Sequence, residues 1–316
     1  MKAGFVSLIG RPNAGKSTLL NRLVGAKVAI VSDKPQTTRT RILGVSHRAG
    51  DPDPARRGQI VFVDTPGIHR PMHRLNVRMV DQAVDTIGWV DLLVVVHDAA
   101  TRTGAGDRFV LELLDRAEAP VILALNKIDR IAKPTLLPLI DWFRRQREFD
   151  AIVPISALTG DGVDGLEKLL WERLPEGEPL YPDDMVTDQP ERVIVAETVR
   201  EKLLRHTRAE LPFSTAVLVD GFEEVSAEAA GEAGADDRAG DAGGLLRLYC
   251  SIVVDRTTHK PIVLGRRGAR IKQIGTEARH ELERFFGTRV FLDLHVRVRT
   301  GWRENDRILR ELGLER

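Results

Sequence analysis

No segment narrows the choice of fold as far as Gly10-Arg-Pro-Asn-Ala-Gly-Lys-Ser17. It follows the apolar run Phe5–Ile9 and opens the helical run Lys16–Leu23. Glycines let a backbone curl around an anion, and a helix N-terminus points its N–H groups at that anion. A lysine and a hydroxyl at the end of such a loop suit nucleotide phosphates and magnesium. The segment predicts a strand–loop–helix unit that binds nucleotide through Gly10, Asn13, Ala14, Gly15, Lys16, Ser17 and Thr18.

Short apolar runs alternate with longer helical stretches through the first half of the chain. The expected strands are Phe5–Ile9, Ile60–Val63, Leu92–Val96, Val121–Leu125 and Ala151–Ile155. The expected helices are Lys16–Leu23, Met72–Ile87, Arg108–Ala117, Leu136–Phe149 and Gly165–Arg173. Such alternation is typical of an α/β fold with a mainly parallel sheet covered on both faces. Sites in these sheets form at the carboxyl ends of the strands.

The tetrad Asn126-Lys-Ile-Asp129 comes directly after one of these strands and indicates which base is bound. A carboxylate at Asp129 can accept from both N1–H and the 2-amino group of guanine, whereas adenine has no matching donors. The wrong base leaves that carboxylate unpaired, which is a large penalty. Asn126 would tie this loop to the phosphate loop, and the stem of Lys127 would cover the base. Backbone amides at Ser156, Ala157 and Leu158, after the last strand, would meet the guanine O6.

Two further segments supply candidates for magnesium and for the γ-phosphate. Asp64 ends a strand, where it can hold magnesium, and the N–H of Gly67 can meet the γ-phosphate. Thr37 and Thr38 lie on the loop expected to cover the triphosphate, and we expect Thr38 to contact the metal. The predicted metal set is Ser17, Thr38 and Asp64, and the predicted catalytic set is Lys16, Asn13, Thr38 and Gly67.

The alternating pattern breaks near Leu174, where proline and acidic residues become frequent. We expect a nucleotide-binding domain over 1–174, a linker over 175–190 and an α+β domain over 191–316. Its expected elements are the helix Ile194–Thr207, strands Thr215–Asp220 and Leu245–Val254, the helix Arg270–Phe286 and the strand Val290–Val298. The stretch 221–244 is rich in alanine, glycine and acid, which predicts a disordered insertion.

The second domain contains a Gly-x-x-Gly loop, Gly265-Arg-Arg-Gly268, which we expect to join an extended segment beside the strands to an amphipathic helix. KH domains use such a loop to hold four nucleotides of a single strand. Arg266, Arg267, Arg270 and Lys272 concentrate positive charge there, and neutralised phosphates release counterions. We therefore predict RNA binding by the six residues Gly265, Arg266, Arg267, Gly268, Arg270 and Lys272.

Composition limits the other interpretations. The formal net charge is +1, so attraction to nucleic acid has to come from a local patch. A single cysteine, Cys250, excludes an internal disulfide, fits a reducing cytoplasm and suggests a buried core residue. No apolar run approaches the length of a membrane span, although peripheral contact at the inner face of the cell membrane is left open.

The ordered motifs resemble those of the translation-factor-related GTPases, and the phosphate loop with Thr37-Thr-Arg39 resembles the Era family. Tyr181–Asp188, Ala196–Leu203, Gly275–Arg279 and Gly301-Trp302 extend the resemblance over nearly the whole chain, with Val193 as a departure. It implies a monomeric GTPase whose KH domain holds the 3′ end of 16S ribosomal RNA on the precursor of the 30S subunit. The alternatives are a GTPase-linked transfer-RNA modification factor and an RNA chaperone that senses nucleotide with little turnover.

The resemblance also bears on catalysis. Many GTPases carry a water-orienting glutamine where this chain has Ile68, so slow intrinsic turnover is expected. In related GTPases an asparagine at the place of Asn13 helps to bind potassium, which stands in for an arginine finger. Potassium is therefore a candidate cofactor beside GTP, GDP and Mg²⁺, although Asn13 could instead only shape the loop.

Overall fold

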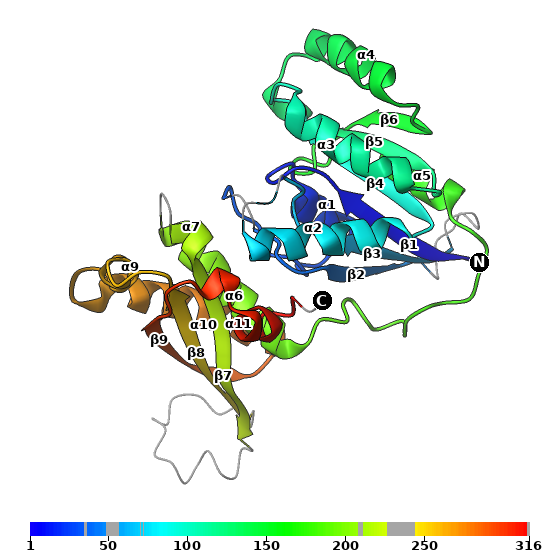
Figure 1. The fold of residues 1–316 in the computed structure, drawn as a ribbon. Coiled ribbons are helices and arrows are strands. Elements are labelled where there is room, and N and C mark those ends of the chain that lie inside the picture. Colours follow the sequence, from blue (N-terminus) through cyan, green and yellow to red (C-terminus); the bar gives the residue numbers. More distant parts are fainter. Residues whose placement is uncertain are drawn as a thin grey trace. The chain divides into compact units, whose positions relative to one another are not determined.

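The computed structural model describes residues 1–34, 37–48, 57–69, 71, 73–207, 211–225 and 244–314. Their contacts separate the chain into two units, Met1–Gln189 with the C-terminal Leu314, and Pro190–Gly313. Figure 1 shows the elements of each unit coloured along the sequence. Among the described residues, no helix combines the length and the apolar character that crossing a membrane requires.

The first unit is built on a six-stranded sheet with the order β2-β3-β1-β4-β5-β6. All neighbouring strands are parallel except β2, which pairs antiparallel with β3. The strands are β1 Lys2–Ile9, β2 Ile42–His47, β3 Gly58–Asp64, β4 Leu92–Asp98, β5 Val121–Asn126 and β6 Ala151–Pro154. The strand order reverses at β1, whose carboxyl end leads into the phosphate loop. This reversal is where ligands bind in sheets of this kind.

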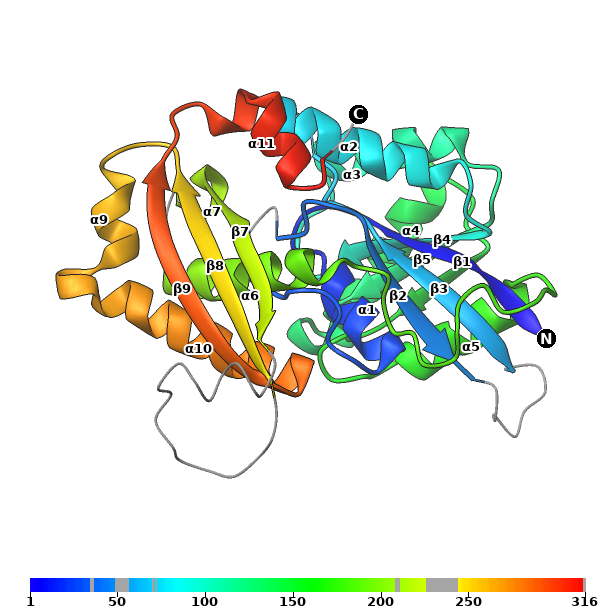
Figure 2. The same cartoon turned by 90° about the horizontal axis from the view of Figure 1, so that it is seen from below.

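Helices cover both faces of this sheet, as the continuous apolar strands predict. One face packs against α1 and α5, and the other against α2, α3 and α4 (Figures 1 and 2). The helices are α1 Lys16–Val24, α2 Arg74–Ile87, α3 Ala105–Leu113, α4 Leu136–Gln146 and α5 Val163–Arg173. Short 3-10 turns lie at Leu114–Arg116, Ile128–Arg130 and Lys133–Thr135. The α/β fold class is therefore as predicted.

The structure corrects several expected boundaries in this unit. Strand β2 was not predicted, because a short run with a central glycine (Gly44) resembles a loop. Helix α3 begins earlier than expected, since Asp107 accepts a hydrogen bond from the N–H of Gly104 at 2.8 Å and caps the first turn. The same helix ends at Leu113, before a 3-10 turn. These differences leave the strand ends that carry the motifs in place.

The last part of the expected linker 175–190 is bonded to the first unit. Its residues run along β2, where Val45 N–H donates to Val186 O at 2.9 Å. Thr187 Oγ1 donates to Leu43 O at 2.6 Å, and Gln189 Nε2 donates to Val28 O at 3.0 Å. The first unit therefore includes the expected linker as far as Gln189, and the second unit begins at Pro190, one residue before the expected start at 191.

The second unit has a three-stranded sheet, β7-β8-β9, with helices α6 and α10 packed on one face. Strand β8 is antiparallel to β7 and parallel to β9. The strands are β7 Thr215–Val225, β8 Leu245–Val254 and β9 Arg289–Val298. The helices are α6 Glu191–His206, α7 Leu211–Ser214, α9 His259–Leu264, α10 Ala269–Phe286 and α11 Asp306–Glu311, with 3-10 turns at Arg266–Gly268 and Trp302–Glu304. This α+β arrangement was predicted.

Two expectations for the second unit were wrong in detail. The predicted disordered insertion 221–244 begins too early, because Gly221–Val225 continue β7 and pair with Leu245–Tyr249. The ring of Phe222 packs edge to face on Phe286, which anchors that extension. The remainder of the insertion, 226–243, lies outside the described residues. A short helix, α9, stands before the Gly-x-x-Gly loop where a segment beside the strands was expected.

Cys250 is fully buried in the core between the sheet and its helices, as predicted. Burial, with the charges of Asp220 and Asp293, raises the pKa of its thiol to about 12. A thiolate is therefore scarce at neutral pH, and the residue acts as a packing group.

Candidate functional site

The phosphate loop joins β1 to α1 and requires glycine at two positions. Gly10 has φ +156°, and a side chain there would lie 2.2 Å from Val96 O. Gly15 has φ +97°, and a side chain there would lie 2.2 Å from Asn126 Nδ2. Both glycines are therefore fixed by close approach of neighbouring strand ends. The N–H groups that follow open α1, as the motif predicted.

Lys16 lies inside this loop and is buried. Its Nζ donates to Gly10 O at 3.2 Å and to Arg11 O at 3.1 Å. Burial lowers the pKa of Lys16, while the charge of Asp64 acts in the opposite direction. An ammonium held by two carbonyls and stripped of water is poised to interact with an anion entering the loop.

Three oxygen-bearing side chains converge next to Lys16. Ser17 Oγ donates to Asp64 Oδ2 at 2.7 Å and lies 2.9 Å from Thr38 Oγ1, which itself donates to Asp64 Oδ2 at 3.1 Å. Burial raises the pKa of Asp64 against the opposing effects of Lys16 and the two hydroxyls. Among the described residues, Asp64 Oδ1 is buried without a hydrogen-bond partner. These hard oxygen donors fit Mg²⁺.

Of the two neighbouring threonines, Thr38 belongs to this cluster. Thr38 is buried, whereas Thr37 Oγ1 donates to Lys34 O at 2.6 Å. The loop that carries both threonines is fastened at its start by Asn21 on α1, which accepts from the N–H groups of Val28 and Ala29 at 3.0 and 2.9 Å.

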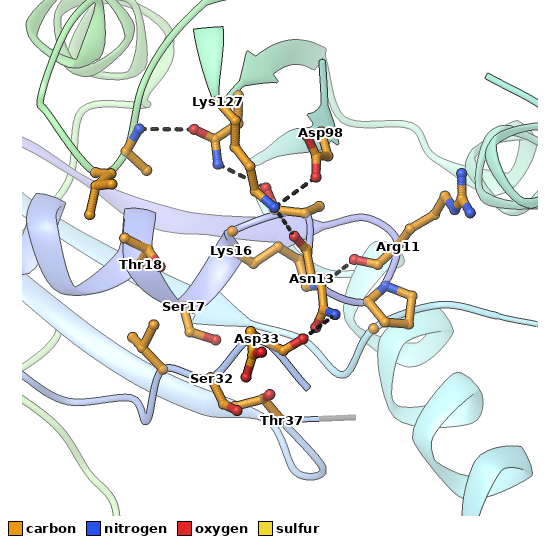
Figure 3. A pocket seen from close by; sticks show the side chains of 18 of the residues that line it. Arg11, Asn13, Lys16, Ser17, Thr18, Ser32, Asp33, Thr37, Asp98 and Lys127 are labelled. Carbon is orange, nitrogen blue, oxygen red and sulfur yellow. Dashed lines mark hydrogen bonds and ion pairs between the residues drawn. The ribbon is translucent and has the colours of Figure 1, made fainter. Parts of the chain in front are cut away.

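The loop after β5 binds the phosphate loop through two side chains. Asn126 Nδ2 donates to Ala14 O at 2.8 Å, as predicted from sequence. Lys127 adopts φ +67° and donates through Nζ to Asn13 O at 2.6 Å and to Asp98 Oδ2 at 2.7 Å. Figure 3 shows Lys127 reaching over the phosphate loop between Asn13 and Asp98. The phosphate loop and the base loop therefore form one connected structure.

Asp129 lies beside the third loop of the site. Its Oδ1 accepts a hydrogen bond from Ser156 Oγ at 2.6 Å, and its side chain is exposed to the cavity side of the loop. The N–H of Ala157 donates to Asn126 Oδ1 at 2.8 Å. Leu158 is 72% exposed and lines the cavity. Ser156, Ala157 and Leu158 thus lie at the site, with the Ala157 N–H engaged by Asn126.

Asn13 and Gly67 flank the far end of the phosphate loop. Asn13 has φ +62°, and its Nδ2 donates to Asp33 O at 2.8 Å (Figure 3). A side chain at Gly67 would lie 2.7 Å from the Cα of Pro12, so this backbone rests directly on the loop. The side chain of Ile68 is 1% exposed and packs in the core with Ile9 and Val63. Ile68 therefore faces away from the cavity.

Together these loops enclose a cavity of about 660 Å³. Its lining includes all the predicted phosphate-loop residues from Asn13 to Thr18, together with Gly67, Asn126, Lys127, Asp129, Ala157 and Leu158. Gly10, Asp64 and Ser156 lie behind this lining through the contacts described above. A cavity of this size accommodates a nucleotide.

Several residues at the site belong to no nucleotide-binding motif and were not predicted from the sequence. Asp98 pairs with Lys127, and Arg22 on α1 donates to the carbonyls of Ala157 and Leu158. Asp107 bonds both His97 Nδ1 at 3.0 Å and Arg11 at 3.1 Å, and these partners lower its pKa although burial acts to raise it. The position of Asp98 at a strand end was the one sequence signal available for this group.

In the second unit, the Gly-x-x-Gly loop is an exposed turn between α9 and α10. Gly265 has φ +72°, and a side chain there would lie 2.7 Å from Arg270 Cβ. Arg267 itself adopts φ +51°, and Gly268 adopts φ +77°. At the tip of the loop, Gly265 and Gly268 have no side chains, and the side chains of Arg266 and Arg267 are exposed.

The other predicted basic residues lie on the first turn of α10. Arg270 donates through Nη1 to Ile262 O, which links α10 back to α9. Lys272 is exposed, and Ile262 is 44% exposed beside the loop. Ile274, Ala278 and Leu282 of the same helix are buried in the core, as predicted. The loop thus combines four cations, two glycines and an exposed apolar residue.

Known proteins resemble both units. Residues 5–127 match the 50S ribosome-binding GTPase family, and residues 242–303 match the KH domain family. GTPase Era of Geobacter metallireducens is 46% identical over 312 residues, covering 99% of this chain and 97% of that protein. GTPase Era of Geobacter sp. strain M21 is 46% identical over 314 residues, covering 99% and 98%.

Two solved structures of Era match the full length of this chain and of their own chains, each at 40% identity. An Aquifex aeolicus Era variant bound to GDP and AlF4⁻ has a TM-score of 0.88. Era in complex with MgGDPNP and nucleotides 1506–1542 of 16S ribosomal RNA has a TM-score of 0.89. The fold and the site define a guanine-nucleotide hydrolase joined to a KH domain. The chain belongs to the Era family of GTPases.

Proposed function

We propose that this protein hydrolyses GTP as a molecular switch, binds 16S ribosomal RNA near its 3′ end and assists assembly of the small ribosomal subunit. The observation that carries the enzymatic part is the convergence of Ser17, Thr38 and Asp64 beside the buried Lys16. The RNA part is supported by the Gly-x-x-Gly loop and by the similar Era structure that holds 16S nucleotides. We propose that it acts as a cytoplasmic monomer on the precursor of the 30S subunit.

In this proposal different residues of the first unit bind different parts of GTP. Lys16 and the N–H groups of Gly15 to Thr18 hold the phosphates, and Asp129 accepts from the guanine edge. Ser17, Thr38 and Asp64 would hold Mg²⁺, which when bound neutralises charge on the phosphate oxygens. The Gly67 N–H would donate to the γ-phosphate. Each role uses an atom that the structure places on or directly behind the cavity wall.

Water activation is assigned to backbone and cation rather than to a side chain after Asp64, because Ile68 is buried in the core. Asn13 supports this assignment, since it lines the cavity and bonds Asp33 O through Nδ2 at 2.8 Å rather than through its amide oxygen. An amide oxygen is a suitable ligand for a monovalent cation. We propose that Asn13 would help to hold potassium, which when bound would supply positive charge beside the phosphate oxygens.

We expect the rate of GTP hydrolysis in potassium chloride to be at least about ten times the rate in sodium chloride. Asn13→Gly should remove most of this difference, because glycine keeps the positive φ without strain and lacks the amide. Phosphate release in matched chloride salts measures both effects, with Asn305→Ala as a control in the second unit. Equal wild-type rates in the two salts would contradict a potassium site.

Coupling between nucleotide and RNA needs a route from the first unit to the KH domain. The segment 186–189 supplies one, because it bonds Val28 on one side of the threonine loop and Leu43 and Val45 on the other. A change in that loop on hydrolysis would alter the anchoring of the segment that leads to the second unit. By linkage, RNA and GTP should then strengthen each other's binding.

An RNA carrying the 3′-terminal nucleotides of 16S ribosomal RNA is expected to bind more tightly with a non-hydrolysable GTP analogue than with GDP. Arg266→Ala should weaken binding and reduce the slope of log K against log salt by about 0.7, the loss of one phosphate contact. Fluorescence anisotropy over a salt series measures both quantities. Arg279→Ala is the matched control, because Arg279 is paired with Glu283 on the same helix.

Two results would contradict this part of the proposal. Equal RNA affinity in the GTP and GDP states, with turnover unaffected by RNA, would refute the coupling. An unchanged salt slope in Arg266→Ala would remove that residue from the RNA contact. Single-turnover hydrolysis in magnesium separates a true GTPase from an RNA chaperone that only senses nucleotide, because the chaperone would leave GTP intact.

A further inference from the structure

Helix α1 carries, in its last turn, a cation that the nucleotide motifs do not use. Arg22 donates through Nε to Ala157 O at 2.7 Å and through Nη2 to Leu158 O at 2.6 Å. Its guanidinium therefore spans two consecutive carbonyls of the loop after β6.

The loop is shaped to receive this guanidinium. Gly160 adopts φ +97°, and a side chain there would lie 2.8 Å from Arg22 Nη1. The turn is closed on itself by Gly160 N–H donating to Ser156 O at 2.8 Å and by Ser156 N–H donating to Asp161 O at 2.8 Å. Arg22 thus fills the place that any larger residue at 160 would take.

Holding the carbonyls also fixes the N–H groups of the same peptide units. Peptide planarity directs the Leu158 N–H opposite to the Ala157 carbonyl. Ala157 and Leu158 both line the nucleotide cavity, where Asn126 already engages the Ala157 N–H. Arg22 therefore orients a backbone donor on the cavity wall from behind, without lining the cavity itself.

We propose that Arg22 is a positioning residue for guanine recognition. It holds the loop at 157–158 so that the Leu158 N–H meets the 6-oxygen of the base. The inference rests on the proposed GTPase function and names a residue outside its motifs. Hydrogen bonds from a charged donor are stronger than neutral ones, so two of them restrain the loop effectively. Their loss should act on nucleotide binding rather than on the chemical step.

The test uses the full chain carrying Arg22→Met, Arg22→Lys or the control Arg145→Met, whose arginine is exposed on α4. Release of a fluorescent mant-GDP from Arg22→Met is expected to be about tenfold faster than from the wild type, with KM for GTP rising by a similar factor. The kcat should stay within about twofold, since the interaction is equal in ground and transition states. Arg22→Lys should fall between the two, because one ammonium cannot span both carbonyls as the planar fork does.

A nucleotide without the 6-oxygen separates positioning from general stability. The diphosphate of 2-aminopurine riboside should leave wild type and Arg22→Met at rates that differ by less than about twofold. Equal acceleration for both nucleotides, or unchanged mant-GDP release, would overturn the role of Arg22. Absence of GTP hydrolysis by the wild type would instead refute the proposed function, so the two failures are distinguishable.

Discussion

Replacing Asp129 with asparagine is expected to lower kcat/KM for GTP by roughly 10⁴-fold and to make XTP the better substrate. The carboxylate accepts from two donors of guanine, and an amide presents an N–H₂ group to the same edge. Xanthine carries a carbonyl in place of the 2-amino group and so matches that amide. The change should exchange the preferred base rather than abolish catalysis.

The geometry around Asp129 allows the base preference to change while the contact with Ser156 is kept. Its Oδ1 accepts from Ser156 Oγ at 2.6 Å, and asparagine retains an oxygen for that bond. The contact of Ser156 with the loop is therefore kept while the other side-chain position changes from acceptor to donor. Initial rates of phosphate release with GTP and XTP, each over a concentration series, give the two kcat/KM values.

Two further variants serve as controls for this prediction. Asp129→Ala should lose GTP without gaining XTP, because it offers neither acceptor nor donor. Asp141→Asn, an exposed carboxylate on α4, should behave like the wild type. If Asp129→Asn hydrolysed GTP within about tenfold of the wild type, the base would be recognised elsewhere in the cavity.

The nucleotide site was largely readable from the sequence because its residues stand at strand ends. Asp64 and Asn126 are the last residues of β3 and β5, and Ser156 follows β6, so the parallel sheet brings all three to one edge. The structure buries Thr38 against Ser17 and Asp64, the two other residues that are predicted to hold the metal. Most residues of the cavity wall could therefore be predicted from their positions at or just after the expected strands.

The contacts that brace this wall could not be read in the same way. Arg22 and Leu158 are 136 residues apart, and Asn21 fastens the threonine loop through backbone groups that any sequence would carry. The anchoring of Gln189 to Val28 is equally long-range. Such contacts depend on how α1 and the sheet are placed, which periodicity does not specify.

Helix α9 shows a different limit. His259–Leu264 contains a proline and two β-branched residues, Ile262 and Val263, which favour an extended segment when only the sequence is considered. In the structure Pro261 is the third residue of the helix, where the backbone N–H has no intrahelical partner to lose. The Gly-x-x-Gly loop was therefore located correctly while the element before it was not.

The second large effect is expected from the pair of neighbouring threonines. Thr38→Ala should lower kcat roughly 100-fold or more and raise the Mg²⁺ concentration needed for half-maximal rate. The reason is that Thr38 Oγ1 belongs to the buried oxygen cluster, 3.1 Å from Asp64 Oδ2 and 2.9 Å from Ser17 Oγ. Its loss removes a metal ligand and the contact that holds the loop over the triphosphate.

Thr37→Ala is the matched control, since it deletes the same atoms one residue away. Thr37 Oγ1 donates to Lys34 O at 2.6 Å, a contact within the loop, so kcat should fall by no more than about threefold. Single-turnover hydrolysis at several Mg²⁺ concentrations measures both variants under conditions where release does not limit the rate. The reverse order of effects would mean that the loop turns by one residue when GTP binds. Thr37 would then be the metal ligand in place of Thr38.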